Sequence, residues 1–183
     1  MTRWSVVYVG CGLSGRRTSL AEVLRCGGKP SSPLTLSGAA SYDIELCVDG
    51  TRTELSMSIS AARSHLYYDD PTSTTLSELV RSELALLEAA DGIVFVLDGQ
   101  IARMPANFEQ FEMLHRDLRS RGVDASGKPT VFQVNKQDLA NGVRLEQVRR
   151  DFFATRADYV ESVATRGVGP VDAVMRLVRL MRC

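Results

Sequence analysis

The chain has 183 residues, 44% of them hydrophobic and 24% charged, which are ordinary proportions for a soluble globular protein. This length suits a single domain over residues 1–183 and is too short for two ordinary domains. The formal net charge is zero, no apolar run approaches about 20 residues and the N-terminus lacks a signal-peptide pattern, so we expect no nucleic-acid binding and no membrane insertion. Four cysteines without paired metal-ligand spacing indicate free thiols, which favours a cytoplasmic location.

Two kinds of apolar periodicity alternate along the chain, which is typical of strands followed by helices. Short, apolar, β-rich segments predict strands at residues 4–9, 93–97, 131–134 and 159–163. Apolar residues at helical spacing predict helices at residues 18–24, 76–90, 107–121, 144–153 and 171–181. Residues 27–40 and 60–75 are irregular and polar, and we expect loops there.

One pair of strands carries its own pairing signal. Residues 42–48 and 51–59 both alternate between apolar and polar, and Asp49-Gly50 between them is the strongest short hairpin signal. These two strands should therefore run antiparallel, whereas strands separated by helices should run parallel. Together the elements predict an α/β fold with a mostly parallel sheet and one antiparallel hairpin.

The apolar strand at residues 131–134 ends in a sharply polar turn, Asn135-Lys136-Gln137-Asp138. In an open α/β sheet, ligands bind at the carboxyl ends of the strands. A carboxylate in the plane of a purine can accept hydrogen bonds from N1–H and the 2-amino group of guanine, and adenine offers no such pair of donors. A Lys stem can lie over the base, and the Asn can tie neighbouring loops together. The alternative is a polar turn that simply follows a strand.

A glycine cluster follows the first strand and precedes a helix, as in a phosphate-binding loop. Its glycines allow backbone N–H groups to surround phosphate oxygens, and the helix N-terminus adds positive potential. The residues expected to bind phosphate are Gly10, Cys11, Gly12, Leu13, Ser14, Gly15, Arg16, Arg17 and Thr18. Arg16 stands where such loops carry Lys, and Arg17 replaces the hydroxyl that normally holds Mg²⁺. The alternative is a Gly-rich strand–helix turn without a ligand.

Four segments resemble the MglA-type small Ras-like GTPases of bacteria, a family linked to cell polarity and gliding motility: VVYVGCGLSG, DGIVFVLDGQIARMPANFEQ, PTVFQVNKQDL and SVATRGVGP. The resemblance covers nearly the whole chain. It implies a P-loop NTPase (Ras-like) fold with a mostly parallel six-stranded sheet, helices on both faces, and GTP or GDP as the ligand. The guanine-binding residues that it implies are Asn135, Lys136 and Asp138, together with the backbone of Val163, Ala164 and Thr165.

The sequence departs from this family where GTP hydrolysis and switching occur. Residues 27–41, in the place of the first switch, are short and match no family motif. In the second switch His65 aligns with the residue that positions water, whereas Ser64 replaces the glycine that meets the γ-phosphate. The sequence leaves open whether His65 is catalytic or a surface histidine. For Mg²⁺ it leaves three alternatives: Thr18 holds the ion, Thr35 holds it, or neither does.

Two functions from different classes are compatible with these motifs. The first is a degenerate or pseudo-GTPase, which binds guanine nucleotide, hydrolyses it slowly or not at all, and acts through protein partners in cell polarity or motility. The second is a molecular switch that hydrolyses GTP once a partner completes its site. The resemblance implies a Roadblock-type regulator as partner, and a related GTPase is the other candidate. Loss of the Mg²⁺ hydroxyl at Arg17 and of glycine at Ser64 favours the first function.

Three further features carry weaker alternatives. Cys11, close to a helix N-terminus, is either a thiol of lowered pKa or a tolerated small residue. His115 lies on a helix without a metal-ligand partner, and we interpret it as a solvated residue. Arg176, Arg179 and Arg182 recur at helical spacing and either bind an acidic partner or serve the helix dipole and solubility.

Overall fold

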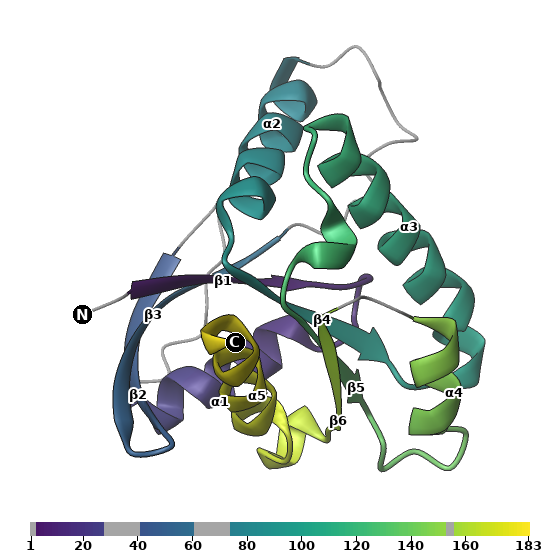
Figure 1. The fold of residues 1–183 in the computed structure, drawn as a ribbon. Helices are drawn as coiled ribbons and strands as arrows, with labels where there is room; N and C mark the ends of the chain where they lie inside the picture. The colour runs from purple at the N-terminus through teal and green to yellow at the C-terminus, as the bar shows by residue number, and fades with distance from the viewer. Residues whose placement is uncertain (1–2, 28–40, 61–73, 153–155) are drawn as a thin grey trace.

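The computed structural model describes residues 3–27, 41–60, 74–152 and 156–183 (Figure 1). Within these residues, six strands form one sheet in the order β2-β3-β1-β4-β5-β6. The strands are β1 (Arg3–Val9), β2 (Ser41–Val48), β3 (Thr51–Ile59), β4 (Gly92–Asp98), β5 (Thr130–Asn135) and β6 (Ala157–Glu161). Neighbouring strands run parallel except β2 and β3, which are antiparallel.

Helices cover both faces of this sheet, as Figure 1 shows. The α-helices of the described residues are α1 (Arg16–Cys26), α2 (Thr74–Ala89), α3 (Met104–Ser120), α4 (Leu145–Asp151) and α5 (Pro170–Arg182). Apolar side chains of α1 and α5 pack with Val6 and Val94 on one face, and those of α2, α3 and α4 pack with Val7 and Phe95 on the other. Successive strand residues point to opposite faces, so each buried strand contributes to both halves of the core.

The fold class predicted from the sequence is confirmed, including the single antiparallel pair. In the hairpin turn Asp49 has φ 51° and Gly50 has φ 76°. Positive φ at both central residues is the requirement of a type I′ turn, whose twist matches that of the two strands it joins. Within the described part of the chain, no helix is both long enough and apolar enough to cross a membrane.

Several boundaries differ from the sequence prediction. Helix α3 begins at Met104 rather than at residue 107, because Pro105 fits in a first helical turn, where its missing N–H has no intrahelical acceptor. Strand β6 lies two residues earlier than predicted, since Val163 forms an isolated bridge with Val168 instead of continuing the strand. Most of the expected loops at residues 27–40 and 60–75 lies outside the described residues.

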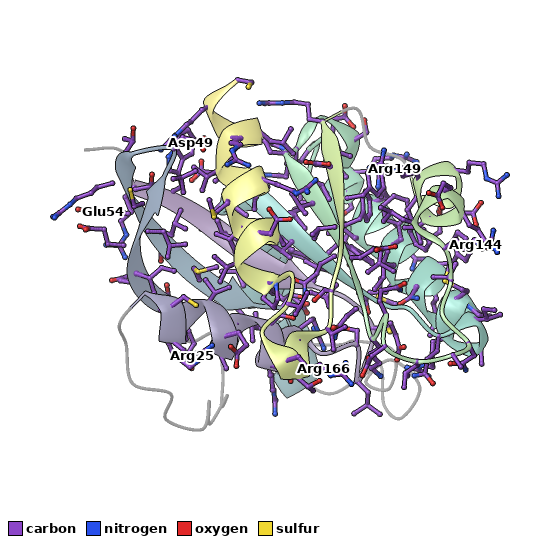
Figure 2. All side chains as sticks on the ribbon, turned by 90° about the horizontal axis from the view of Figure 1, so that it is seen from below. Arg25, Asp49, Glu54, Arg144, Arg149 and Arg166 are labelled. Carbon is purple, nitrogen blue, oxygen red and sulfur yellow. The ribbon has the colours of Figure 1, made fainter. Side chains whose placement is uncertain are left out.

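Helix α5 is tied by charged side chains to the two edges of the sheet. Arg179 makes two hydrogen bonds to the Asp49 carboxylate in the β2–β3 turn, at 2.7 and 2.9 Å, and Arg182 donates to the Thr53 hydroxyl at 2.7 Å. Arg176 contacts an aspartate on β6 and one on its own helix. All three arginines therefore have partners within the chain. Figure 2 shows Asp49 beside one end of α5 and Arg166 at the other.

Candidate functional site

The candidate site lies at the carboxyl ends of strands β1, β4, β5 and β6. The glycine cluster follows β1, and Asn135 is the last residue of β5. Strand β4 ends at Asp98, and the register of the sheet places this residue directly beside Asn135. Ser162 follows β6 on the far side of β5. A glycine loop, a carboxylate, an amide and a hydroxyl thus lie together at the carboxyl ends of four parallel strands. This is where ligands usually bind to such sheets.

The glycine loop, residues 10–15, has the backbone of a tight anion-binding turn. Gly10 and Gly15 have φ values of 149° and 102°, a region that residues with a Cβ rarely adopt. A Cβ at Gly10 would overlap the Val96 carbonyl, and one at Gly15 would overlap the side-chain nitrogen of Asn135. Leu13 also has positive φ, 66°, and its side chain is 88% exposed. Helix α1 begins directly after the loop, so its first N–H groups face the same space.

Asn135 is buried and links the glycine loop to the loop after β6. Its side-chain nitrogen donates to the Ser14 carbonyl at 2.8 Å, and its Oδ1 accepts from the Ala164 amide at 2.9 Å. The Ser162 hydroxyl is a third, longer contact at 3.4 Å. Because both short bonds go to backbone atoms, Asn135 fixes the positions of two loops whatever side chains they carry. This is the loop-tying role predicted for it from sequence.

A second buried amide, Gln133, lies beneath Asn135 on β5 and was not identified from the sequence. Its Nε2 donates to the Ser19 hydroxyl on α1 at 2.8 Å and to the Ser162 hydroxyl at 2.9 Å. Its position inside an apolar strand was the available signal, since a buried amide requires hydrogen-bond partners. The two amides together join α1, β5 and β6 below the site.

Lys136 follows Asn135 with a positive φ of 64°. Its ammonium donates to the Asp98 carboxylate at 2.7 Å, and Asp98 is 1% exposed. Arg103 approaches the same carboxylate, with Nε 3.6 Å away, and its NH2 donates to the Gly12 carbonyl at 2.8 Å. Neither Asp98 nor Arg103 was identified from the sequence. Asp98 could have been found, because it ends a fully apolar strand as abruptly as Asn135 does.

Asp138 lies at the surface, with one described charged partner, Arg166, at 3.6 Å. Arg166 ends the short 3-10 turn η4 (Ala164–Arg166), which follows the bridge between Val163 and Val168. Thr165 in this turn is exposed. The structure therefore places the loop at residues 163–165 next to the turn at residues 135–138, as the resemblance implied. The Ala164 amide itself is directed to Asn135.

Arg16, Arg17 and Thr18, which the sequence led us to expect near phosphate, lie in different surroundings. The guanidinium of Arg16 is directed to the Ser60 carbonyl at the end of β3 and donates a hydrogen bond to it. Burial lowers the pKa of Arg16, with smaller electrostatic contributions from its neighbours. Arg17 and Thr18 in the first turn of α1 are exposed. None of these three side chains is part of the Asn135 or Asp98 networks.

For Mg²⁺, the described residues offer few donors. They contain no cluster of three or more His, Cys, Asp or Glu side chains that could hold a metal ion. Thr18, the described hydroxyl considered for this role, lies one residue beyond the place of the usual ligand. Thr35 and His65 fall outside the described residues, so the structure does not place either of them. The backbone of the glycine loop fits a phosphate group, whereas the described part of the chain offers no comparable set of donors for a resident metal.

Cys11 is a buried thiol, and its Sγ donates to Oδ1 of Asn107 at 3.2 Å. Burial raises its pKa, whereas the positive charge of Arg103 acts to lower it and the negative charge of Asp98 to raise it further. A raised pKa and lack of access make a thiol unreactive. Cys11 therefore matches the second sequence alternative, a small residue that the loop tolerates.

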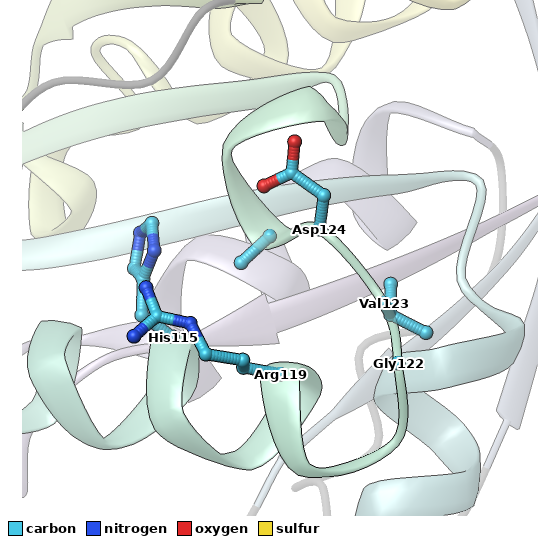
Figure 3. A pocket seen from close by; sticks show the side chains of 6 residues that line it. His115, Arg119, Gly122, Val123 and Asp124 are labelled. Atoms are coloured by element: carbon cyan, nitrogen blue, oxygen red, sulfur yellow. The ribbon is translucent and has the colours of Figure 1, made fainter.

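A separate hollow of about 360 Å³ lies away from the candidate site, between the end of α3 and the turn that leads to β5 (Figure 3). His115 and Arg119 extend side by side from α3 along its wall. His115 is half-buried and packs edge-on against Phe111, with ring centroids 4.3 Å apart. The sequence interpretation of His115 as a solvated residue was therefore wrong in part. Its apolar neighbour Phe111 belongs to the core.

This sheet order, with a glycine loop after β1 and an Asn-Lys-x-Asp turn after β5, is that of the Ras-like P-loop GTPases. The chain is 31% identical over 179 residues to the mutual gliding-motility protein MglA of Myxococcus xanthus (strain DK1622), an alignment that covers 96% of this chain and 89% of that protein. No family model matches the chain. At this identity and coverage the chain belongs to the MglA-type small GTPases, and the resemblance noted in the sequence is confirmed. Membership implies binding of a guanine nucleotide.

Proposed function

We propose that this protein is a guanine-nucleotide-binding domain, over residues 1–183, that works through a protein partner and hydrolyses GTP slowly or not at all. The observation that carries the nucleotide site is the pair of bonds made by Asn135. They join the loop expected to hold phosphate to the loop expected to cap the base. GTP or GDP would span both loops, with its phosphates in residues 10–18 and its base between residues 135–138 and 163–165.

Asp138 is the residue that would select guanine. Its partly buried carboxylate would turn toward N1–H and the 2-amino group of the base, because its partner Arg166 is a surface residue at 3.6 Å and such pairs are weak. The stem of Lys136 would lie along the base while its ammonium stays on Asp98. In the loop at residues 163–165, the Val163 amide donates to the Val168 carbonyl and the Ala164 amide to Asn135, so the Thr165 N–H is the backbone donor that would face the guanine O6.

Weak hydrolysis is proposed because the groups that position water and metal are altered. Phosphoryl transfer depends on positioning and on charge stabilisation, to which Mg²⁺ normally contributes when bound. Here Arg17 stands where the metal hydroxyl belongs, and Ser64 replaces the glycine that meets the γ-phosphate. Arg16 and Arg17 would neutralise phosphate charge, with Thr18 or Thr35 as the remaining hydroxyls for a metal. His65 is the remaining candidate for a catalytic residue.

A partner is proposed because the fold and base-reading turn are kept while the switch segments are rewritten. The relative from Myxococcus xanthus is named for gliding motility, and we place this chain in the same kind of process, motility or cell polarity. The partner would be a Roadblock-type regulator or a related GTPase, and the setting the cytoplasm. It would contact residues 27–41 and 60–76, where small GTPases meet their partners.

The test of the nucleotide site is Asp138→Asn, assayed by competition between GDP, XDP and ADP. We expect GDP to bind about 30-fold more weakly, since a bidentate charge-assisted pair contributes about 2 kcal/mol, and XDP to bind better than to the unaltered protein. Asp151→Asn is the control, because Asp151 is an exposed carboxylate at the end of α4. Equal affinity of the unaltered protein for ADP and GDP would contradict the proposal.

Hydrolysis is tested separately by single-turnover measurements on the full chain, with and without a Roadblock-type protein. We expect turnover near that of GTP in water in both the unaltered protein and the His65→Ala variant. If GTP is instead hydrolysed briskly, and His65→Ala abolishes this without loosening GTP binding, the protein is a working molecular switch.

A further inference from the structure

A buried charge system lies between the two halves of the site. The Asp98 carboxylate is 1% exposed and has two cations against it, the Lys136 ammonium at 2.7 Å and the Arg103 Nε at 3.6 Å. A buried carboxylate is expensive to desolvate unless paired, so Asp98 requires these partners. Lys136 belongs to the base-reading turn and Arg103 to the turn after β4. One carboxylate thus holds two elements that would meet different parts of the nucleotide.

The backbone of Asp98 is fixed as firmly as its side chain. Asn107 on α3, which is fully buried, accepts from the Asp98 amide at 3.1 Å and donates to the Asp98 carbonyl at 2.8 Å. The Asp98 Oδ1 also accepts from the amide and side chain of Gln100, at 3.2 and 3.1 Å. The carboxylate therefore has little freedom to follow either cation if one moves.

Arg103 extends this system to the glycine loop. It ends the 3-10 turn η2 (Ile101–Arg103), and its guanidinium has one nitrogen facing Asp98 and another donating to the Gly12 carbonyl at 2.8 Å. A planar fork can serve two acceptors in fixed directions, which a lysine ammonium on its flexible stem does less well. Its side chain is 39% exposed, so the contact lies near the surface of the site.

The Gly12 carbonyl determines the direction of the next amide. In a planar trans peptide the C=O of one residue and the N–H of the next point in opposite directions. A Gly12 carbonyl held outward by Arg103 therefore directs the Leu13 N–H to the other side of that peptide. Leu13 has φ 66°, a left-handed conformation that is unfavourable for a residue with a Cβ. Something must hold it, and Arg103 is positioned to do so.

We propose that Arg103 is a positioning residue for nucleotide phosphates, and that Asp98 couples it to the base-reading Lys136. Arg103 fixes the Gly12–Leu13 peptide so that the Leu13 N–H faces the phosphate-binding space. This proposal rests on the proposed nucleotide site. It predicts that base and phosphate groups are recognised cooperatively, since both depend on the same buried carboxylate.

The test compares guanosine, GMP and GDP as competitors of a fluorescent GDP analogue. Arg103→Ala should weaken GDP binding about tenfold, the effect of one hydrogen bond to a charged group, and leave guanosine affinity unchanged. Arg103→Lys should recover part of the loss. Asp98→Asn should weaken guanosine binding, because it releases Lys136, and should weaken GDP binding further, because it also releases Arg103. Arg116→Ala is the control, an exposed arginine on the neighbouring helix α3.

Equal losses for guanosine and GDP in Arg103→Ala, or no loss for either, would overturn the proposal. A second measurement tests the position of the Leu13 amide directly, without a binding assay. In ¹H–¹⁵N spectra of the full chain, added pyrophosphate should shift the Leu13 amide of the unaltered protein and not that of Arg103→Ala, with a smaller shift in Arg103→Lys. A protein that fails to prefer guanine over adenine nucleotides refutes the proposed site itself, which is a different outcome from these.

Discussion

The two halves of the site are built in different ways. In the turn after β5, Asn135 and Lys136 both make short hydrogen bonds to buried or backbone groups of neighbouring segments. In the glycine loop and the start of α1, the backbone keeps its tight turn, but Arg16 is directed to the Ser60 carbonyl and Arg17 is exposed. A ligand loop can therefore keep its backbone shape while its charged side chains change.

The reason for this difference lies in which atoms hold the loop. Asn135 bonds to the backbone of Ser14, and Arg103 bonds to the backbone of Gly12. Neither contact depends on the side chains at residues 16–18. Substitution at Arg16 or Arg17 consequently alters the charge presented to a ligand without disturbing the turn.

The most damaging way to break this arrangement is Gly15→Ala. The new Cβ would overlap the Asn135 side chain, and φ 102° is unfavourable for alanine. We expect a loss of about 3 kcal/mol in the free energy of unfolding, from steric overlap together with backbone strain. Urea unfolding of the full chain measures it.

Gly12→Ala is the matched control, because a Cβ at Gly12 meets nothing within 4 Å. Its unfolding free energy should stay within about 0.5 kcal/mol of the unaltered protein. If the two alanine variants are equally stable, the close approach of Gly15 and Asn135 does not hold the loop.

A smaller effect is expected from changing the charge of the phosphate side. Arg16→Ala should weaken GDP binding about tenfold, since it removes the partly buried cation closest to the start of α1.

Removing divalent ions with a chelator should change GDP affinity only a few-fold, because Arg17 occupies the place of the metal hydroxyl. Titration calorimetry measures both affinity changes. A hundred-fold loss with chelator would show that Thr18 or Thr35 holds a metal after all.

The smallest effect concerns His115, away from the site. Burial lowers its pKa, with opposing contributions of Glu112 and Asp124 and a lowering one of Arg119. The folded protein therefore binds this proton less readily than the unfolded chain, so stability falls slightly as pH drops below about 6.5. Imidazole NMR titration checks the shift. His65→Ala leaves a single imidazole signal, and a midpoint above that of a free histidine would contradict the prediction.

The sequence predicted the sheet and the sharply polar turn at residues 135–138 because both depend on local patterns. A polar Asn-Lys-x-Asp after an apolar strand can be recognised without knowing what lies beside it. Asp98 was open to the same argument, and strand order alone would have placed it next to Asn135. Arg103 was not predictable in this way, since its contact with Gly12 depends on the direction of a 3-10 turn between two elements.

Helix α5 is synthesised after every strand of the sheet, yet it supplies part of the core beneath the central strands. Its Val174 and Leu177 pack in the same cluster as Val94. Its Arg179 donates a hydrogen bond to Asp49, which lies 130 residues earlier in the chain. While α5 is still inside the ribosome, this helix does not yet cover the face of the sheet that carries Val6 and Val94. This half of the core can therefore be completed only after α5 has left the ribosome.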